Sequence, residues 1–203
     1  MNQLLLQKTE QIKDEVIAIR RHLHQHPELS FQEFETSKFI QEKLNSWGIS
    51  FQNNIVGTGV VALIESKTNP TSCIALRADM DALPIQELNE VDYKSHNPGI
   101  MHACGHDVHT SILLATAKIL NDLKDELPTS VKLIFQPGEE KLPGGAKLMI
   151  EAGVLENPKV DQIFALHVFP ELEAGKVGLK SGMYMASCDE LYFTINGKGG
   201  HAA

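Results

Sequence analysis

Histidine and cysteine gather in one short segment of the sequence, residues 101–110. Within it Cys104 and His106 are two residues apart, and Gly105 between them lets the backbone bend so that both side chains face one point. Cysteine sulfur and histidine nitrogen are strong ligands for zinc-like ions. A thiolate also has enough lone pairs to bridge two ions, and the N-terminus of a following helix would help to keep it ionised. We therefore interpret this segment as a candidate metal site.

Polar groups that can bind a metal follow three short apolar runs, residues 73–78, 131–136 and 162–166. In open α/β sheets the ligand crevice lies just beyond the carboxyl ends of the strands. If the runs are strands, we expect their ends to bring these groups together near Cys104. The groups are Asp79 and Asp81, then Glu139 and Glu140, and finally His167.

Glu139 and Glu140 are adjacent, so in a strand their side chains would point to opposite faces. They follow Pro137 and Gly138, where the backbone can turn, so one carboxylate can bind metal while the other reaches a metal-bound water. The pKa of a zinc-bound water is about 7, and a neighbouring carboxylate can accept its proton as the water attacks a carbonyl. Hydrolysis of an amide needs this pair of roles.

Each candidate also has a structural alternative. Asp79 and Asp81 could cap turns, and Glu139 and Glu140 could be solvated surface groups. His167 could be a hydrogen-bonded core histidine. For two further histidines the pattern favours neither a ligand nor a structural role: His96 and His109.

A second histidine group, His22, His24 and His26, could form another metal site. Within a helix this spacing cannot point all three rings in one direction, so a structural or surface role is favoured. Cys73 and Cys188 are lone cysteines, which usually fill space in a core.

The apolar pattern predicts alternating helices and strands. We expect helices at residues 4–24, 34–47, 109–123 and 145–152, and strands at residues 59–65, 73–78, 131–136 and 162–167. The strand runs are continuously apolar, which is typical of strands buried on both faces. This alternation indicates an α/β sheet with helices on both faces.

Near the end of the sequence the pattern changes. Residues 189–196 alternate between apolar and polar side chains, which predicts a half-buried antiparallel strand, and a glycine-rich turn follows at residues 197–200. We place a domain boundary near Ser187, between a first domain at residues 1–186 and a second at residues 187–203.

Length and charge narrow the classes of protein. The sequence has 203 residues, enough for one domain or for one and part of another. Its net charge of −8 argues against a nucleic-acid partner, which needs a basic face. Three cysteines make no disulfide framework, and the sequence shows neither a signal peptide nor a membrane span. We expect a cytoplasmic protein with no membrane partner.

Five segments in order resemble one protein family. The sequence resembles the amidohydrolase branch of the aminoacylase and carboxypeptidase zinc metallopeptidases, which includes hippurate hydrolase and N-acyl-L-amino acid amidohydrolases. The segments are RHLHQHPELS at residues 21–30, LRADMDALP at 76–84, HACGHD at 102–107, QPGEE at 136–140 and GKGGHAA at 197–203.

The resemblance implies a zinc-peptidase-like α/β domain with a mixed, mainly parallel sheet, and a smaller α+β lid domain that begins near residue 187. It also implies two divalent metal ions, Zn²⁺ or Mn²⁺. Cys104 would bridge them, His106 and Glu140 would complete the site of one ion, and His167 would bind the other. A homodimer through the lid is compatible with the resemblance.

Three further roles follow from the resemblance. Glu139 would be the general base and acid, and Asp81 would orient the metal ligands. His201 matches a lid histidine that steadies the carbonyl oxygen of the substrate. The family has one more metal-binding histidine near its C-terminus, and this sequence ends before it, so we expect it to be the N-terminal part of such an enzyme and inactive alone.

The leading hypothesis is therefore a metal-dependent hydrolase of small N-acyl amino acids, for example N-acetyl or N-benzoyl ones, in which Glu139 is the base for a metal-activated water. One alternative is an N-acetyldiaminopimelate deacetylase. Another is a metal-binding fragment without catalytic activity.

Overall fold

The computed structural model describes residues 2–185 and 191–201. Its contacts divide the chain into a larger unit, Met1–Val168, and a smaller unit, Phe169–Ala203. Helices and strands of the described residues all lie in the larger unit. No helix in residues 2–185 and 191–201 is long and apolar enough to cross a membrane.

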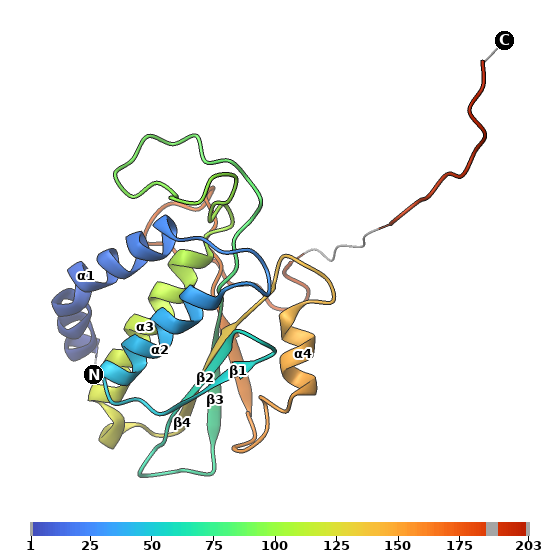
Figure 1. Cartoon of the computed structure of the whole chain (residues 1–203). Helices are drawn as coiled ribbons and strands as arrows, with labels where there is room; N and C mark the ends of the chain where they lie inside the picture. The colour runs from blue at the N-terminus through green and yellow to red at the C-terminus, as the bar shows by residue number, and fades with distance from the viewer. Residues whose placement is uncertain (1, 186–190, 202–203) are drawn as a thin grey trace. The chain divides into compact units, whose positions relative to one another are not determined.

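The larger unit begins with two helices followed by three strands, and helices and strands alternate from α3 onward (Figure 1). The helices are α1 (Asn2–Gln25), α2 (Phe34–Ser46), α3 (His106–Asp122) and α4 (Gly145–Glu151), with a short 3-10 helix, η1, at Lys124–Glu126. The strands are β1 (Phe51–Ile55), β2 (Gly59–Ile64), β3 (Cys73–Asp79), β4 (Ser130–Gln136) and β5 (Gln162–Ala165).

The helix boundaries follow the local sequence. α1 repeats apolar residues at helical spacing, which buries Ile19, and it ends shortly before Pro27. The helix predicted at residues 109–123 begins earlier, at His106. The reason is Gly105, which takes the left-handed conformation (φ +89°) just before the first turn. His106 therefore stands on the first turn of α3.

The five strands form one mixed sheet in the order β1-β2-β4-β3-β5, which confirms the predicted fold class. β3 is parallel to β4 and to β5, whereas β2 is antiparallel to β1 and to β4. Asp79 pairs with Gln136 at the end of β3 and β4, and Arg77 pairs with Ala165. Because these three strands run in the same direction, their carboxyl ends lie at one edge of the sheet.

Helices cover both faces of the sheet, as predicted (Figure 1). α1, α2 and α3 pack on one face, around a core that includes Leu23, Ile40, Leu114 and Phe135. α4 lies on the other face, where Met149 packs into a smaller core. The strand ends are thus carried by a sheet that is packed on both sides, and close-packed layers resist displacement.

Two edge strands differ from the predictions. The run at residues 162–167 is predicted to be buried on both faces, but all four residues of β5 are exposed. β5 is an edge strand among the described residues, so its outer side has no neighbour there. β1 is not predicted at all, because Gln52, Asn53 and Asn54 are poor strand formers, and these residues are exposed at the opposite edge.

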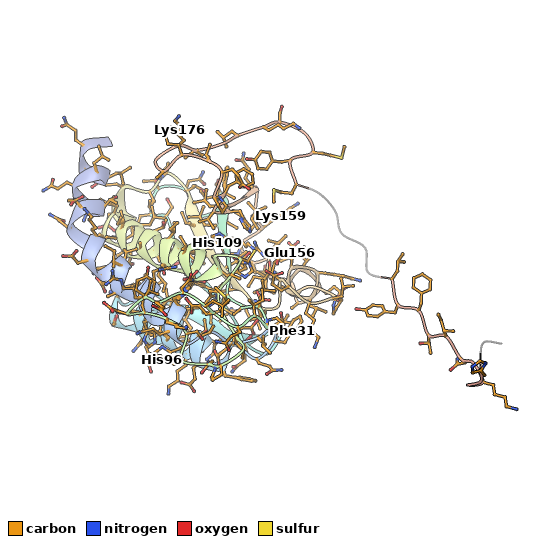
Figure 2. The ribbon with its side chains drawn as sticks, turned by 90° about the horizontal axis from the view of Figure 1, so that it is seen from above. Phe31, His96, His109, Glu156, Lys159 and Lys176 are labelled. Carbon is orange, nitrogen blue, oxygen red and sulfur yellow. The ribbon has the colours of Figure 1, made fainter. Side chains whose placement is uncertain are left out.

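The smaller unit is described in residues 169–185 and 191–201, and these residues contain no helix or strand. An ion pair joins Glu173 to Lys176, which Figure 2 labels. The amide of Lys176 also donates a hydrogen bond to the Glu173 carbonyl at 3.1 Å. This part of the unit is therefore ordered locally by short-range turns.

The strand predicted at residues 189–196 begins outside the described residues. In its described part, residues 191–196, no strand forms, so the prediction is not confirmed there. A lone strand is at best marginal in water, and the described part of the smaller unit contains no second strand with which it could pair.

Candidate metal centre

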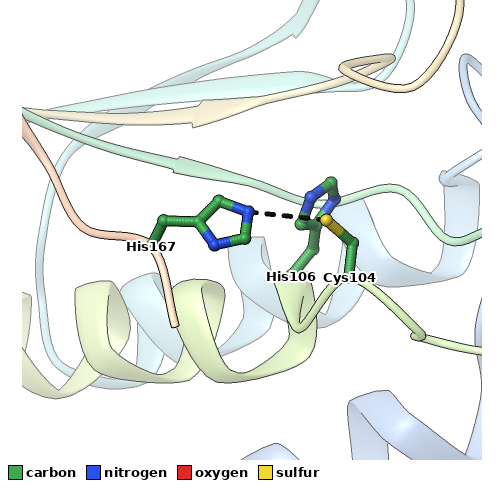
Figure 3. A group of neighbouring side chains, drawn as sticks. All are labelled: Cys104, His106 and His167. Carbon is green, nitrogen blue, oxygen red and sulfur yellow. Dashed lines mark hydrogen bonds between the residues drawn. The ribbon is translucent and has the colours of Figure 1, made fainter. Parts of the chain in front are cut away.

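Four segments bring predicted site residues to the edge at which β3, β4 and β5 end. The segment after β3 carries Asp81, the turn after β4 carries Glu139 and Glu140, and the segment after β5 carries His167. The loop that leads into α3 carries Cys104, beside His106. Figure 3 shows His167 pointing at the Cys104 sulfur, with His106 next to them on the first turn of α3.

Ligand atoms in this region form three overlapping groups, and within each group they lie within 4.8 Å of one another. His106 belongs to all three, so it stands at the centre of the candidate site. The groups are Cys104, His106 and His167; His106, Glu139 and Glu140; and Asp79, His106 and His109.

Two buried atoms of the site lack a hydrogen-bond partner. They are His106 Nε2 and Glu140 Oε1, which face each other across 3.7 Å. Beside them the Cys104 sulfur lies 3.4 Å from His167 Nε2. Buried polar atoms in proteins are nearly always paired, so unpartnered ones that converge on a point need an explanation. A bound cation supplies one.

Asp81 forms hydrogen bonds with both His106 and Glu140. Its Oδ1 lies 3.2 Å from His106 Nδ1, and its Oδ2 accepts hydrogen bonds from the Glu140 amide (2.9 Å) and the Ser30 hydroxyl (2.6 Å). Burial would raise the pKa of the Asp81 carboxyl, but these bonds outweigh it and lower the pKa. A carboxylate at Nδ1 keeps a proton on that nitrogen, so the lone pair of Nε2 is left for a metal.

In the group that contains His109, both ring nitrogens of that histidine are already used in hydrogen bonds within the protein. His109 Nδ1 lies 2.7 Å from Asp79 Oδ1, and His109 Nε2 accepts a hydrogen bond from the Val168 amide at 3.0 Å. Because an amide only donates, Nε2 is the acceptor and Nδ1 carries the proton. His109 has no free nitrogen for a metal, and it holds the residue next to His167.

Asp79 is likewise committed to the protein. Besides His109 it pairs with Arg77, whose Nη1 lies 2.7 Å from Asp79 Oδ2. Burial would raise the pKa of Asp79, but the His109 hydrogen bond and the Arg77 charge outweigh it and hold the pKa well below its usual value. Asp79 is therefore a structural carboxylate that fixes α3 to the end of β3.

The half-buried Cys104 is surrounded by negatively charged side chains. Burial and the neighbouring Glu140 carboxylate raise the pKa of the Cys104 thiol to about 12. The thiolate is therefore disfavoured unless a cation lies beside it. Burial would lower the pKa of His106, but Asp81 and Asp79 outweigh it and raise the pKa. Both shifts reflect the carboxylates that surround these two side chains.

The same edge of the sheet lies within a segment that matches a known family. The sequence model of peptidase family M20/M25/M40 matches residues 75–197, more than half of the chain. The chain belongs to this family. The resemblance read from the five sequence motifs is thereby confirmed.

The relatives of this chain include a named amidohydrolase and a named deacetylase. The N-acyl-L-amino acid amidohydrolase of Geobacillus stearothermophilus is 47% identical over 194 residues, which are 96% of this chain and 52% of that protein. The N-acetyl-L-cysteine deacetylase of Bacillus subtilis is 46% identical over 192 residues, which are 95% of this chain and 45% of that protein. The chain thus spans about half the length of the curated relatives it matches.

A solved structure shares the fold. The YXEP protein of Bacillus subtilis is described as a dinuclear metal-binding peptidase of the M20 family. It superimposes with a TM-score of 0.80 at 44% identity, over 85% of this chain and 47% of that chain.

In this M20 chain the structure gathers six of the seven predicted site residues at one edge of the sheet. The six are Asp81, Cys104, His106, Glu139, Glu140 and His167. The seventh, His201, belongs to the smaller unit. The individual roles of these residues stay predictions.

The second histidine group of this M20 chain is divided between two places. His24 is buried, with Nδ1 2.7 Å from Asp107 Oδ2 and Nε2 3.2 Å from Glu87 Oε1. The exposed rings of His22 and His26 instead contact each other, 4.5 Å between centroids. The metal-competent groups among the described residues do not include these histidines.

Cys73 and His96 belong to none of the metal-competent groups among the described residues. Cys73 is buried at the start of β3, as expected for core filling. Cys188 lies outside the described residues. His96 makes an edge contact with the ring of His26, 5.2 Å between centroids.

Three residues near the site are not singled out by the sequence: Ser30, Glu33 and Val168. Each acts through a long-range hydrogen bond, to Asp81, to Gly138 and to His109 respectively. No local spacing signals these contacts. Ser30 is, however, the last residue of the HPELS segment that the family motif contains, and Glu33 follows it three residues later.

Proposed function

We propose that the full protein hydrolyses the amide bond of small N-acyl amino acids with the help of two divalent cations. The observation that carries the proposal is the pair of buried, unpartnered atoms His106 Nε2 and Glu140 Oε1, with Cys104 and His167 beside them. The names of the two relatives, an N-acyl-L-amino acid amidohydrolase and an N-acetyl-L-cysteine deacetylase, support the substrate class.

The donor set fits two divalent cations. Cys104 would be shared, His106 and Glu140 would hold one ion, and His167 would hold the other. Sulfur and imidazole suit Zn²⁺, and the carboxylate also suits Mn²⁺. A thiol that coordinates a metal ion is deprotonated, which fits a Cys104 whose pKa is otherwise raised to about 12. When bound, such ions polarise a carbonyl oxygen and lower the pKa of water to about 7.

Glu139 would move the protons of the reaction. Its side chain is exposed beside the half-buried Glu140, and the loss of part of its hydration, together with the Glu140 charge, raises its pKa above the usual value. A higher pKa makes a carboxylate a better base at neutral pH. The water oxygen bonds to the amide carbon as Glu139 takes one of its protons. The carbon–nitrogen bond then breaks, and Glu139 gives that proton to the leaving nitrogen.

Asp81 and His201 would assist without taking protons from the water. Asp81 holds His106 Nδ1 and the Glu140 amide, so it orients two metal ligands at once. His201 would donate a hydrogen bond to the carbonyl oxygen of the substrate. The products are a carboxylate and a free amino acid.

The test is turnover by the full protein of N-acetyl-L-alanine, N-benzoylglycine and N-acetyldiaminopimelate. We expect one of the two simple substrates to be cleaved, with activity lost in a chelator and restored by Zn²⁺ or Mn²⁺. Cleavage of N-acetyldiaminopimelate alone would narrow the function to that deacetylation. Turnover that survives complete metal removal, or no turnover of any N-acyl amino acid, would contradict the proposal.

A further inference from the structure

Glu33 is a fully buried carboxylate whose hydrogen-bond donors are all uncharged. Its Oε1 accepts hydrogen bonds from the amides of Phe31 (2.9 Å) and Gly138 (2.8 Å), and its Oε2 accepts one from the Thr58 hydroxyl (2.6 Å). Burial raises the pKa of Glu33 in spite of these bonds. Burying a carboxyl group away from any cation is costly, so its placement here calls for a reason.

Capping of its own helix is not that reason. Glu33 occupies the position before α2, but its side chain makes no hydrogen bond to the first turn of the helix. Glu28 performs that task, because its carboxylate accepts hydrogen bonds from the amides of Glu35 (3.1 Å) and Thr36 (2.8 Å). The side chain of Glu33 is thereby free to reach the end of β4.

The amide that Glu33 binds belongs to the turn that carries Glu139. Gly138 has a left-handed backbone (φ +56°), and an added Cβ would overlap the ring of Phe31, the residue labelled in Figure 2. The Gly138 carbonyl accepts a hydrogen bond from the Gly145 amide at 2.8 Å. Glu33 therefore fixes the amide of the residue that directly precedes Glu139, and the Gly145 amide fixes the carbonyl of that residue.

A single turn must send two adjacent carboxylates in different directions. Asp81 holds the Glu140 amide at 2.9 Å, which fixes the metal side of the turn. Glu33 holds the Gly138 amide, which fixes the other side. Hydrogen bonds to an ionised acceptor are roughly twice as strong as neutral ones, so a carboxylate is a firm anchor for two amides.

We propose that Glu33 is a positioning residue for Glu139: it locks the left-handed turn at Gly138 and thereby aims the Glu139 carboxylate at the reacting amide. The inference rests on the proposed function of Glu139. It adds that the segment that leads into α2, which contributes no ligand, controls the geometry of proton transfer through one buried side chain.

The test compares three variants of the full protein with N-acetyl-L-alanine as substrate. Glu33→Met keeps the length of the side chain but removes both acceptors. Glu33→Gln keeps an acceptor for the two amides and can donate its amide hydrogen to Thr58. Thr58→Val is the matched control, because it removes the partner of Glu33 that does not touch the turn.

We expect Glu33→Met to lower kcat by about 10²-fold, the loss that a displacement of about 1 Å can cause, with KM and bound metal unchanged. Glu33→Gln should restore kcat close to the wild-type value. Thr58→Val should lose stability but keep its kcat. An equal loss of kcat in Glu33→Met and Thr58→Val at matched stability would overturn the inference, as would an unchanged kcat in Glu33→Met.

Two further measurements keep the inference separate from folding and from the proposed function. If Glu33→Met does not fold, amide hydrogen exchange decides: the Gly138 amide should be strongly protected in the wild type, and rapid exchange there would overturn the inference. Glu139→Gln tests the base itself. A wild-type rate in Glu139→Gln would refute the role of Glu139. If Glu139→Gln loses its activity but Glu33→Met is fully active, only the role of Glu33 is refuted.

Discussion

The candidate site has a deep side and an outer side, which differ in how firmly the chain holds them. The deep side consists of Asp81, His106 and Glu140, and both Asp81 and His106 are 1% exposed. The outer side consists of Cys104, Glu139 and His167, of which Glu139 and His167 are exposed and Cys104 is half-buried. The first turn of α3 and the segments that directly follow β3 and β4 carry the deep side, whereas the loop before α3, the turn after β4 and the segment after β5 carry the outer side.

The hydrogen bonds divide in the same way. On the deep side Asp81 binds His106, the Glu140 amide and Ser30 directly. On the outer side His167 Nδ1 bonds only to the carbonyl of the adjacent Val168 (2.7 Å), and Val168 is in turn held through the bond between its amide and His109. Preorganised ligands bind metal with little reorganisation, so the deep side should dominate metal affinity. The outer side, which is open to substrate, should dominate the rate.

The largest expected effect is on the outer side. Glu139→Gln in the full protein should lower kcat by about 10²–10⁴-fold, the usual contribution of a positioned base, and should keep its bound metal. Glu140→Gln is the matched control on the deep side and should lose metal first. Steady-state kinetics and metal analysis of the two variants check this, and loss of metal in Glu139→Gln would reverse the comparison.

On the deep side, Asp81→Asn should weaken metal binding by about 10–100-fold, because His106 and the Glu140 turn lose a shared anchor. Competition with a chromophoric chelator measures the affinity. Asp92→Asn, at an exposed carboxylate, serves as control and should bind metal like the wild type. An affinity in Asp81→Asn equal to that of the control would mean that the deep side does not need this support.

A pair of substitutions at His109 examines the indirect support of His167. Asn places its amide where Nδ1 was and keeps the contact with Asp79, whereas Gln reaches the position of Nε2 and keeps an acceptor for the Val168 amide. We expect His109→Asn to bind the second metal ion about 10-fold more weakly than His109→Gln. Calorimetric titration with Zn²⁺ checks the order, and the reverse order would show that His167 is held in another way.

The smallest effect concerns stability at Glu33. Burial raises the pKa of this carboxyl in the folded state, so the folded chain binds its proton more tightly than the unfolded chain does. The free energy of unfolding should therefore fall as the pH rises from the unfolded pKa, about 4.3, through the folded one. In Glu33→Gln this contribution is absent. Denaturant unfolding of both proteins from pH 4 to 8 should show the variant gaining relative stability with pH, and a constant difference would contradict it.

The deep architecture could be predicted because its signals are local. The runs that become β3 and β4 are largely apolar, and metal-competent carboxylates follow both within a few residues. The segment around Cys104 shows its chemistry in residue types alone. The parallel pairing of β3 with β4 then brings Asp81 and Glu140 together, as expected from the strand ends.

The rest could not be predicted, because it depends on contacts between distant residues. His109 Nε2 is used by the Val168 amide, 59 residues away, so sequence spacing could not tell a ligand from a support. Glu33 binds the Gly138 amide across 105 residues, and its place before a helix suggests a cap that it does not form. β1 is set by its pairing with β2 rather than by its own polar sequence.

X-ray absorption of zinc bound to the full protein tests the central claim most directly, since it reads the ligand atoms themselves. The account predicts a sulfur at about 2.3 Å from zinc together with nitrogen and oxygen at about 2.0–2.2 Å. The sulfur signal should vanish in Cys104→Ala and persist in Cys73→Ala. A wild-type spectrum with only nitrogen and oxygen around zinc, or a sulfur signal that survives in Cys104→Ala, would contradict a metal centre built on Cys104.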